Sequence, residues 1–234
     1  MKNQICSIEM CTGCAACANI CPKNAINMTV DSKGFLRPFV FVDKCVNCNL
    51  CQKTCPQNKN ATMNDGEIYA AVSKNDTIRK KSTSGGAFSS LASYILDNNG
   101  VVFGAELTDD LRVAHTSIER FDDIYKLRGS KYIQSDIGNT YREAKKYLSD
   151  NRLVLFSGTP CQISGLKEYL GKEYDNLITI DILCHGVPSP LVFEKFINNI
   201  INRFFITRNW RCRNNYTVVF SKCNFFKFVC RHSC

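Results

Sequence analysis

The sequence has no run of about eighteen apolar residues, so a membrane-spanning helix is not predicted. Its first residues lack the apolar core of an export signal, so a disulfide-forming compartment is not indicated either. Acidic residues are missing from Lys195 to Cys234, where eight Lys and Arg occur, whereas charges nearly balance before that point. We therefore expect a cytoplasmic protein without a membrane span, ending in a segment of different character.

Cysteine, in contrast, is abundant, with 15 in 234 residues. Residues 11–22 and 45–56 share one pattern, C-x2-C-x2-C-x3-C-P. This pattern resembles that of bacterial two-cluster ferredoxins. Three thiolates at this spacing can surround one iron–sulfur cluster, because a tight loop points successive sulfurs inward and offers amides to the bridging sulfides.

The resemblance to two-cluster ferredoxins also implies crossed ligation, in which the fourth cysteine of each run binds the other run's cluster. The implied ligands of one [4Fe-4S] cluster are Cys11, Cys14, Cys17 and Cys55. Those of the second cluster are Cys45, Cys48, Cys51 and Cys21. Disulfides would need an oxidising compartment, and zinc would use four ligands rather than two overlapping sets, so we favour iron–sulfur clusters over both. Cys6 is interpreted as a spare thiol.

Three segments are predicted along the chain. Residues 1–60 form a ferredoxin-type dicluster domain, in which two short strands flank a turn at 31–34. Residues 66–199 alternate strands and helices. The predicted fold class is thus an α+β ferredoxin-like dicluster module followed by an α/β domain with a mixed, partly parallel sheet. Residues 200–234 form an atypical basic, aromatic tail.

The elements of the second domain follow from its apolar periodicity. The predicted strands cover 69–73, 101–106, 112–118, 131–134, 152–157 and 177–183, and the predicted helices cover 85–97, 121–127, 140–148 and 161–170. Two apolar strands joined by the last helix predict a parallel βαβ unit. Cys161 and Cys184 then follow the carboxyl ends of buried strands, where open α/β sheets bind ligands.

The residues leave the chemistry at this edge open. Cys161 begins a helix, which favours a thiolate, but it could be a redox thiol, a cluster ligand or a small buried residue. Cys184 and His185 at the neighbouring strand end indicate a shared site, although a lone His here would more often be a turn residue. Residues 82–86 suit either a phosphate or an ordinary helix start.

Four stretches, at 82–86, 128–135, 158–165 and 184–190, resemble the coenzyme F420 hydrogenase/dehydrogenase beta-subunit family. Bacterial members of that family carry a dicluster module in front. The resemblance covers about residues 1–195 and implies FAD as a further cofactor. It implies that Cys161, Cys184 and His185 act beside the flavin as ligands or proton-handling groups. The implied flavin contacts are Ser84, Gly85, Gly86, Lys131, Gln134, Thr159, Pro160 and Gln162.

The predicted function is an iron–sulfur flavoprotein oxidoreductase of anaerobic metabolism. Electrons would pass from a ferredoxin-type donor through two [4Fe-4S] clusters to FAD and a small organic acceptor. The alternative is a non-catalytic electron-transfer subunit of a larger partner enzyme. The sequence departs from the family after about residue 199, so the flavin domain is expected to be incomplete and the tail foreign to the family. Arginine and aromatic residues in the tail could bind single-stranded nucleic acid, an alternative that we disfavour.

Overall fold

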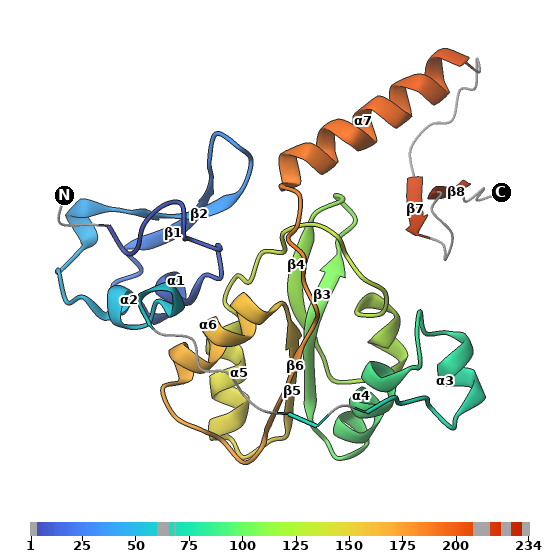
Figure 1. The fold of residues 1–234 in the computed structure, drawn as a ribbon, viewed down its shortest axis with the longest axis horizontal. Helices are drawn as coiled ribbons and strands as arrows, with labels where there is room; N and C mark the ends of the chain where they lie inside the picture. The colour runs from blue at the N-terminus through green and yellow to red at the C-terminus, as the bar shows by residue number, and fades with distance from the viewer. Residues whose placement is uncertain (1–3, 60–65, 68, 208–215, 221–225, 231–234) are drawn as a thin grey trace.

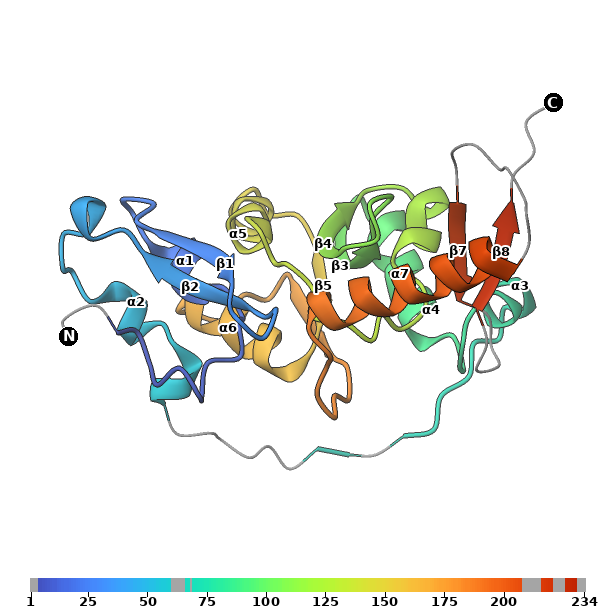
Figure 2. The ribbon, with the colours of Figure 1, turned by 90° about the horizontal axis from the view of Figure 1, so that it is seen from above.

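The computed structural model describes residues 4–59, 66–67, 69–207, 216–220 and 226–230. A cysteine-rich module made of residues 4–59 packs beside an α/β domain (Figure 1). The view turned by 90° places this module at one end of the molecule and the β7–β8 pair at the other (Figure 2). The predicted order of a small module followed by an α/β domain is therefore confirmed.

The cysteine-rich module is a hairpin framed by short helices. Its two strands pair antiparallel with Ile26 opposite Val40, as the alternating pattern predicts. The carboxylate of Asp31 accepts hydrogen bonds from the backbone of Lys33 and Phe35 at 2.8 and 2.9 Å, which closes the hairpin turn. The elements are α1 (Ala16–Ile20), β1 (Ile26–Val30), β2 (Leu36–Val40), η1 (Val42–Lys44), α2 (Leu50–Lys53) and η2 (Pro56–Asn58).

The second domain is built on a mixed sheet with strand order β4-β3-β5-β6. Strands β3, β5 and β6 are parallel, and β4 pairs antiparallel with β3, which confirms both the fold class and the βαβ unit. The strands are β3 (Val101–Leu107), β4 (Val113–Ile118), β5 (Val154–Gly158) and β6 (Leu177–Asp181). The helices are α3 (Asp76–Lys80), α4 (Ala87–Asp97), η3 (Phe121–Lys126), α5 (Thr140–Ser149) and α6 (Pro160–Leu170).

Helices cover both faces of this sheet. Helix α4 and η3 cover one face, and α5 and α6 cover the other, between the sheet and the cysteine-rich module (Figure 1). The central strand β5 is buried along its whole length because it has a strand on each side and helices on both faces. Within it, Phe156 stacks on Phe103 with ring centroids 5.3 Å apart.

Two predicted strands are absent. Residues 69–73 form no strand, although the Ser73 N–H donates to the Gly85 carbonyl. Residues 131–134 form no strand either, because side-chain bonds rather than a ladder hold them. The helix predicted over 121–127 is present over Phe121–Lys126 and is of the 3₁₀ type. In addition, β6 is only half-buried instead of buried, because it is the last strand of the described sheet.

The last part of the chain extends away from the sheet. Helix α7 (Pro190–Thr207) begins beside the β1–β2 turn, where a Cβ added to Gly34 would lie 2.3 Å from Leu191 Cβ. Strands β7 (Tyr216–Phe220) and β8 (Phe226–Cys230) pair antiparallel. The rest of the predicted tail lies outside the described residues. Among the residues that are described, no helix has both the length and the apolar character that crossing a bilayer requires.

Replacing Phe156 with Ala tests the central packing. The ring is fully buried between Phe103, His115 and Tyr141, so we expect the Phe156→Ala variant to lose about 3–5 kcal/mol of unfolding free energy. Chemical denaturation measures the loss. Leu91→Ala is the matched control, because Leu91 on α4 is 40% exposed and should cost less than about 1 kcal/mol. Equal losses in the two variants would contradict this account of the core.

Candidate functional site

The two cysteine runs fold into the same backbone shape. Gly13 and Asn47, which precede the second cysteine of each run, have φ of 72° and 54°. Ala15 and Asn49, which follow it, have φ of 59° and 60°, and α1 and α2 begin directly after them. Left-handed residues that alternate with right-handed ones turn backbone amides toward a common centre, which suits an anion. Because L-residues such as Ala rarely adopt positive φ, its repetition at matching positions indicates a functional constraint.

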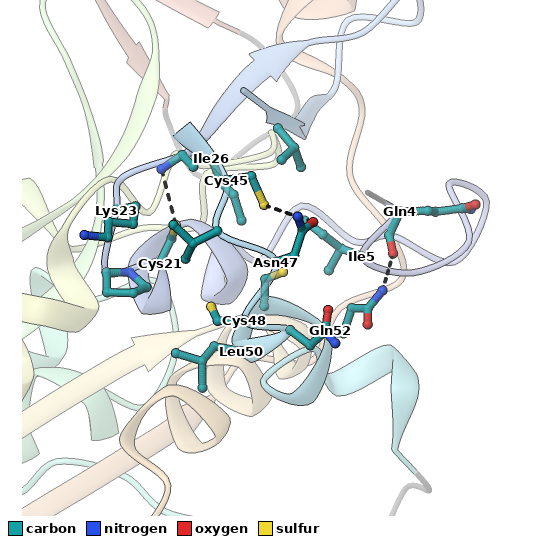
Figure 3. Close-up of a pocket in the computed structure, with 16 residues that line it drawn as sticks. Gln4, Ile5, Cys21, Lys23, Ile26, Cys45, Asn47, Cys48, Leu50 and Gln52 are labelled. Atoms are coloured by element: carbon teal, nitrogen blue, oxygen red, sulfur yellow. Dashed lines mark hydrogen bonds between the residues drawn. The ribbon is translucent and has the colours of Figure 1, made fainter. Parts of the chain in front are cut away.

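Two pockets divide the eight cysteines of the runs into crossed sets. The first pocket is lined by Cys11, Cys14, Cys17 and Cys55. The second pocket is lined by Cys21, Cys45, Cys48 and Cys51. Figure 3 shows the second pocket, with residues from both cysteine runs around it. Crossed ligation requires this grouping, and the assignment of the individual ligands stays a prediction.

The donor set of these pockets suits iron–sulfur clusters. The eight cysteines of the two runs are free thiols. Burial raises the pKa of Cys14 to about 11, and burial together with neighbouring thiols raises that of Cys17 further. Buried thiols crowded in this way can become thiolates only beside compensating cations, which iron supplies. The backbone N–H of Ala25 also donates to Cys21 Sγ at 3.2 Å, as a thiolate ligand requires.

The spacing of the thiols differs from that of a single-ion site. Among the residues that the structure describes, no three His, Cys, Asp or Glu side chains converge closely enough to hold one metal ion. The ligands of a cubane each bind a different iron atom, so their sulfurs stand farther apart than those around one zinc ion.

The first pocket is joined to the core of the α/β domain. Cys14 belongs to the same buried cluster as Tyr141, Ile163 and Leu166. A Cβ added to Gly165 of α6 would lie 3.1 Å from both Cys14 Sγ and the Tyr141 hydroxyl, so glycine permits this close approach. Cys161 stands in the first turn of α6, the helix whose Gly165 meets Cys14, so the same helix carries Cys161 and the contact with this pocket.

The second pocket faces outward. Cys48 is exposed, and Val46, which follows Cys45, is 57% exposed. The neighbouring lysines Lys23, Lys44 and Lys53 are exposed as well. The two thiol pockets therefore differ in surroundings, because one contacts the α/β domain and the other contacts solvent.

Hydrogen bonds hold the module against the domain. Arg142 of α5 donates to the carbonyls of Ala18, Asn19 and Cys21 at 2.8–3.3 Å, which satisfies the carboxyl end of α1. Gln134 pairs with both backbone groups of Leu36 on β2, and its amide also lies against Gly13. These contacts attach both the hairpin and the first cysteine loop to the α/β domain.

The predicted flavin contacts divide between two helix starts. At the start of α4, Ser84 is exposed, Gly85 packs against the Ala71 carbonyl and Gly86 has φ of 86°. Lys131 donates to the carbonyls of Lys126 and Arg128, and burial lowers its pKa to about 8. The segment that contains Lys131 and Gln134 connects the two helix starts, since Arg128 donates to Ser89 on α4 and Ser135 contacts Gln162 on α6.

At the start of α6, Thr159 and Gln162 form a capping box, with Pro160 in the first turn. The Thr159 hydroxyl lies 3.1 Å from Cys161 Sγ. Cys184 and His185 are exposed after β6, where the Gly186 N–H lies 3.4 Å from Cys184 Sγ. Thr159 is thus the hydrogen-bond partner of Cys161, and Gly186 is that of Cys184.

A buried polar network that sequence reasoning missed holds the start of α6. His115 Nε2 donates to the Ser157 carbonyl at 3.1 Å, so its Nδ1 accepts from the Ser135 hydroxyl at 3.0 Å. Gln162 then donates to Ser135 at 2.8 Å and accepts from Thr159. Burial lowers the pKa of His115 to about 4, so the ring stays neutral and this pattern persists near pH 7. An isolated His in a strand gives no sequence signal for such a network.

Protein-family models match three stretches of the chain. One described as "4Fe-4S dicluster domain" matches residues 10–59. Those for the N-terminal and C-terminal parts of the coenzyme F420 hydrogenase/dehydrogenase beta subunit match residues 68–140 and 151–203, together more than half of the chain. The fold and its thiol pockets thus define an iron–sulfur electron-transfer protein. The chain belongs to the coenzyme F420 hydrogenase/dehydrogenase beta-subunit family.

A solved structure is also similar. It is a chain from the F420-reducing [NiFe] hydrogenase complex of Methanosarcina barkeri, determined after xenon derivatization, with 20% sequence identity and a TM-score of 0.43. The similarity covers 56% of the present chain and 48% of that chain, so the present chain spans about half the length of its relative. The comparison with curated proteins gives no match.

The polar network gives an expected dependence of stability on pH. The folded pKa of His115 is about 4 and the ordinary value is 6.5, so the unfolded chain binds the extra proton between these values. We expect the unfolding free energy to fall by up to about 3 kcal/mol as the pH drops through this window. Denaturation at several pH values measures the slope. His115→Gln should lose that part of the slope, and equal slopes in both proteins would contradict the assignment.

The attachment of the module can be tested at Arg142. Arg142→Ala leaves three carbonyls near the end of α1 without their donor, so we expect a loss of about 1–3 kcal/mol of unfolding free energy. Thermal or chemical denaturation measures this loss. Lys146→Ala, at an exposed position on the same helix, is the control and should stay within about 0.5 kcal/mol of the unmodified protein. A similar small effect at Arg142 would show that these bonds do not hold the module.

Proposed function

We propose that the chain is an iron–sulfur flavoprotein oxidoreductase. It takes electrons from a ferredoxin-type donor and carries them through two [4Fe-4S] clusters toward FAD and an organic acceptor. Residues 1–60 are the dicluster domain, 66–199 are the α/β domain, and 200–234 are a tail that lies beyond the family match from residue 204 onward. The observation that carries the proposal is the presence of two four-thiol pockets with opposite exposure.

The clusters, when bound, supply one-electron carriers, and their potentials depend on hydrogen bonding and solvent access. In the first pocket, Cys14, Cys17 and Cys55 are buried, so these residues exclude water from the side that meets α6. In the second pocket, Cys48 is exposed, so this side is open to a donor protein. The direction that we propose therefore runs from the exposed pocket to the buried one and on to the start of α6.

The residues implied for FAD do not form a ready cradle. The ammonium of Lys131 donates to two carbonyls, Gln134 is bonded to Leu36, and Gln162 is bonded to Thr159 and Ser135. Neither thiol pocket is lined by any implied flavin residue. The flavin part of the proposal consequently rests on family membership alone.

The second candidate is a non-catalytic electron-transfer subunit that serves a larger partner enzyme. The engaged side chains of Lys131, Gln134 and Gln162 favour it, because these groups already have protein partners. The exposed position of Cys184 and His185 favours it as well. Both candidates share the two clusters and differ in the flavin.

Anaerobic reconstitution of the full chain tests the proposal. We expect about eight irons and eight sulfides per chain, with the absorption and electron paramagnetic resonance of reduced cubanes. Flavin released from the reconstituted protein is measured by fluorescence. One FAD per chain supports the flavoprotein, whereas eight irons without flavin identify the electron-transfer subunit. A folded chain that binds no iron rules out both.

The matched control uses one cysteine from each pocket. Cys14→Ala and Cys48→Ala should each damage one cluster and leave the other, so either variant should keep about half of the iron or slightly more. Because Cys14 contacts the α/β core and Cys48 is exposed, only Cys14→Ala should also change the stability of that core. Complete iron loss in either variant would show that the two pockets are not separate sites.

A further inference from the structure

A fifth thiol lies at the first pocket. Cys6 lines this pocket together with the four predicted ligands Cys11, Cys14, Cys17 and Cys55. Its side chain packs against Cys55, and Cys11 lines the same pocket. The side chain is half-buried and packs against Ile5, Cys17, Ile26 and Cys55. A cubane needs four protein ligands, so this pocket has one thiol more than it needs.

The chain connection keeps this thiol at the pocket. Cys6 and Cys11 lie at the two ends of a turn in which the backbone N–H groups of Met10 and Cys11 both donate to the Ser7 carbonyl at 3.1 Å. This short closed loop limits how far Cys6 can move from Cys11. Cys6 is nevertheless only half-buried, so its side chain can reorient without opening the core.

The internal repeat supplies a comparison within the same chain. The second cysteine run begins 34 residues after the first, at Cys45 rather than Cys11. The same offset from Cys6 leads to Val40, which lines the second pocket. Matching positions of the two pockets are therefore occupied by cysteine in the first and by valine in the second, and only the first has a surplus thiol.

We propose that Cys6 is a reserve ligand of the first cluster site, an inference that rests on the iron–sulfur part of the proposed function. When Cys11 no longer holds its iron, Cys6 takes its place. In this exchange the Cys6 thiol gives its proton to solvent and its sulfur forms the new Fe–S bond. The departing thiolate takes up a proton, so no electron is transferred. The second pocket cannot make this exchange, because Val40 has no donor atom.

The test measures iron and sulfide content and electron paramagnetic resonance after anaerobic reconstitution of the full chain. Cys11→Ala should keep about eight irons, with the signal of the first cluster altered by its new ligand. Cys6→Val combined with Cys11→Ala should lose one iron of that cluster, with the signal of a three-iron centre, or lose the whole cluster. Cys45→Ala should show the same loss at the second pocket, because no reserve thiol lies there.

The remaining variants make every result decisive. Cys6→Val alone should keep about eight irons, and iron loss in this variant would overturn the proposal by making Cys6 an obligatory ligand. Loss of the first cluster in Cys11→Ala, with the second cluster intact as evidence of folding, would also overturn it. So would full iron retention in Cys45→Ala, since three ligands would then suffice. An unmodified chain without iron would instead refute the proposed function.

Discussion

The structure of the cysteine-rich module depends on the crossing of its two runs. Cys21 leaves the first run to line the second pocket, and Cys55 leaves the second run to line the first. Neither pocket can be completed by one run alone. Burial is the main cause that raises the pKa values of Cys14 and Cys17, so both groups stay neutral thiols until a cation compensates for the loss of their protons. Because cluster ligands must be thiolates, iron binding is accompanied by proton release from these cysteines.

The module does not depend on iron alone for its place in the molecule. Arg142 donates a hydrogen bond to the Asn19 carbonyl at the carboxyl end of α1, and the side-chain amide of Gln134 accepts one from the backbone N–H of Leu36 on β2. Both bonds come from the α/β domain and reach backbone groups beside the cysteine loops. The domain therefore supports the loops before and after cluster binding. Cys14 of the first pocket lies against Gly165 and belongs to the buried core of the α/β domain. None of the four cysteines of the second pocket belongs to that core.

Patterns that concern the backbone or the spacing of one residue type could be predicted from the sequence. The spacing of the cysteines predicts the dicluster module. The alternation around Asp31 predicts the hairpin, and the apolar strands on either side of α6 predict the parallel βαβ unit. These features are local or repeat with a fixed period. The stretch at 131–134 has strand-like residues, but Lys131 and Gln134 are held by side-chain bonds to carbonyls and to β2. Such partners are distant in sequence, so no local pattern reveals them.

The candidate site shows the same limit. His115 is an isolated polar residue in a strand, and its role appears only when Ser135 and Gln162 come together around it. Cys6 has no spacing relation to a cluster motif, and only the fold places it beside Cys11 and Cys55. The predicted site shared by Cys161, Cys184 and His185 relied on neighbouring strand ends and stays a prediction, since the hydrogen-bond partners in the structure are Thr159 for Cys161 and Gly186 for Cys184.

The position of Cys161 bears on how the two parts of the chain communicate. Its thiol belongs to the first turn of α6, the helix that meets the first cysteine pocket at Gly165, and this turn is held by the capping box and the His115 network. A neutral His115 gives this network a single set of donors and acceptors, so the turn keeps one conformation near pH 7. Electron transfer benefits from such rigidity, because a carrier held in fixed surroundings changes charge with little rearrangement. The family motif at 158–162 therefore forms the start of the helix that packs against the cysteine-rich module, besides any role in binding a cofactor.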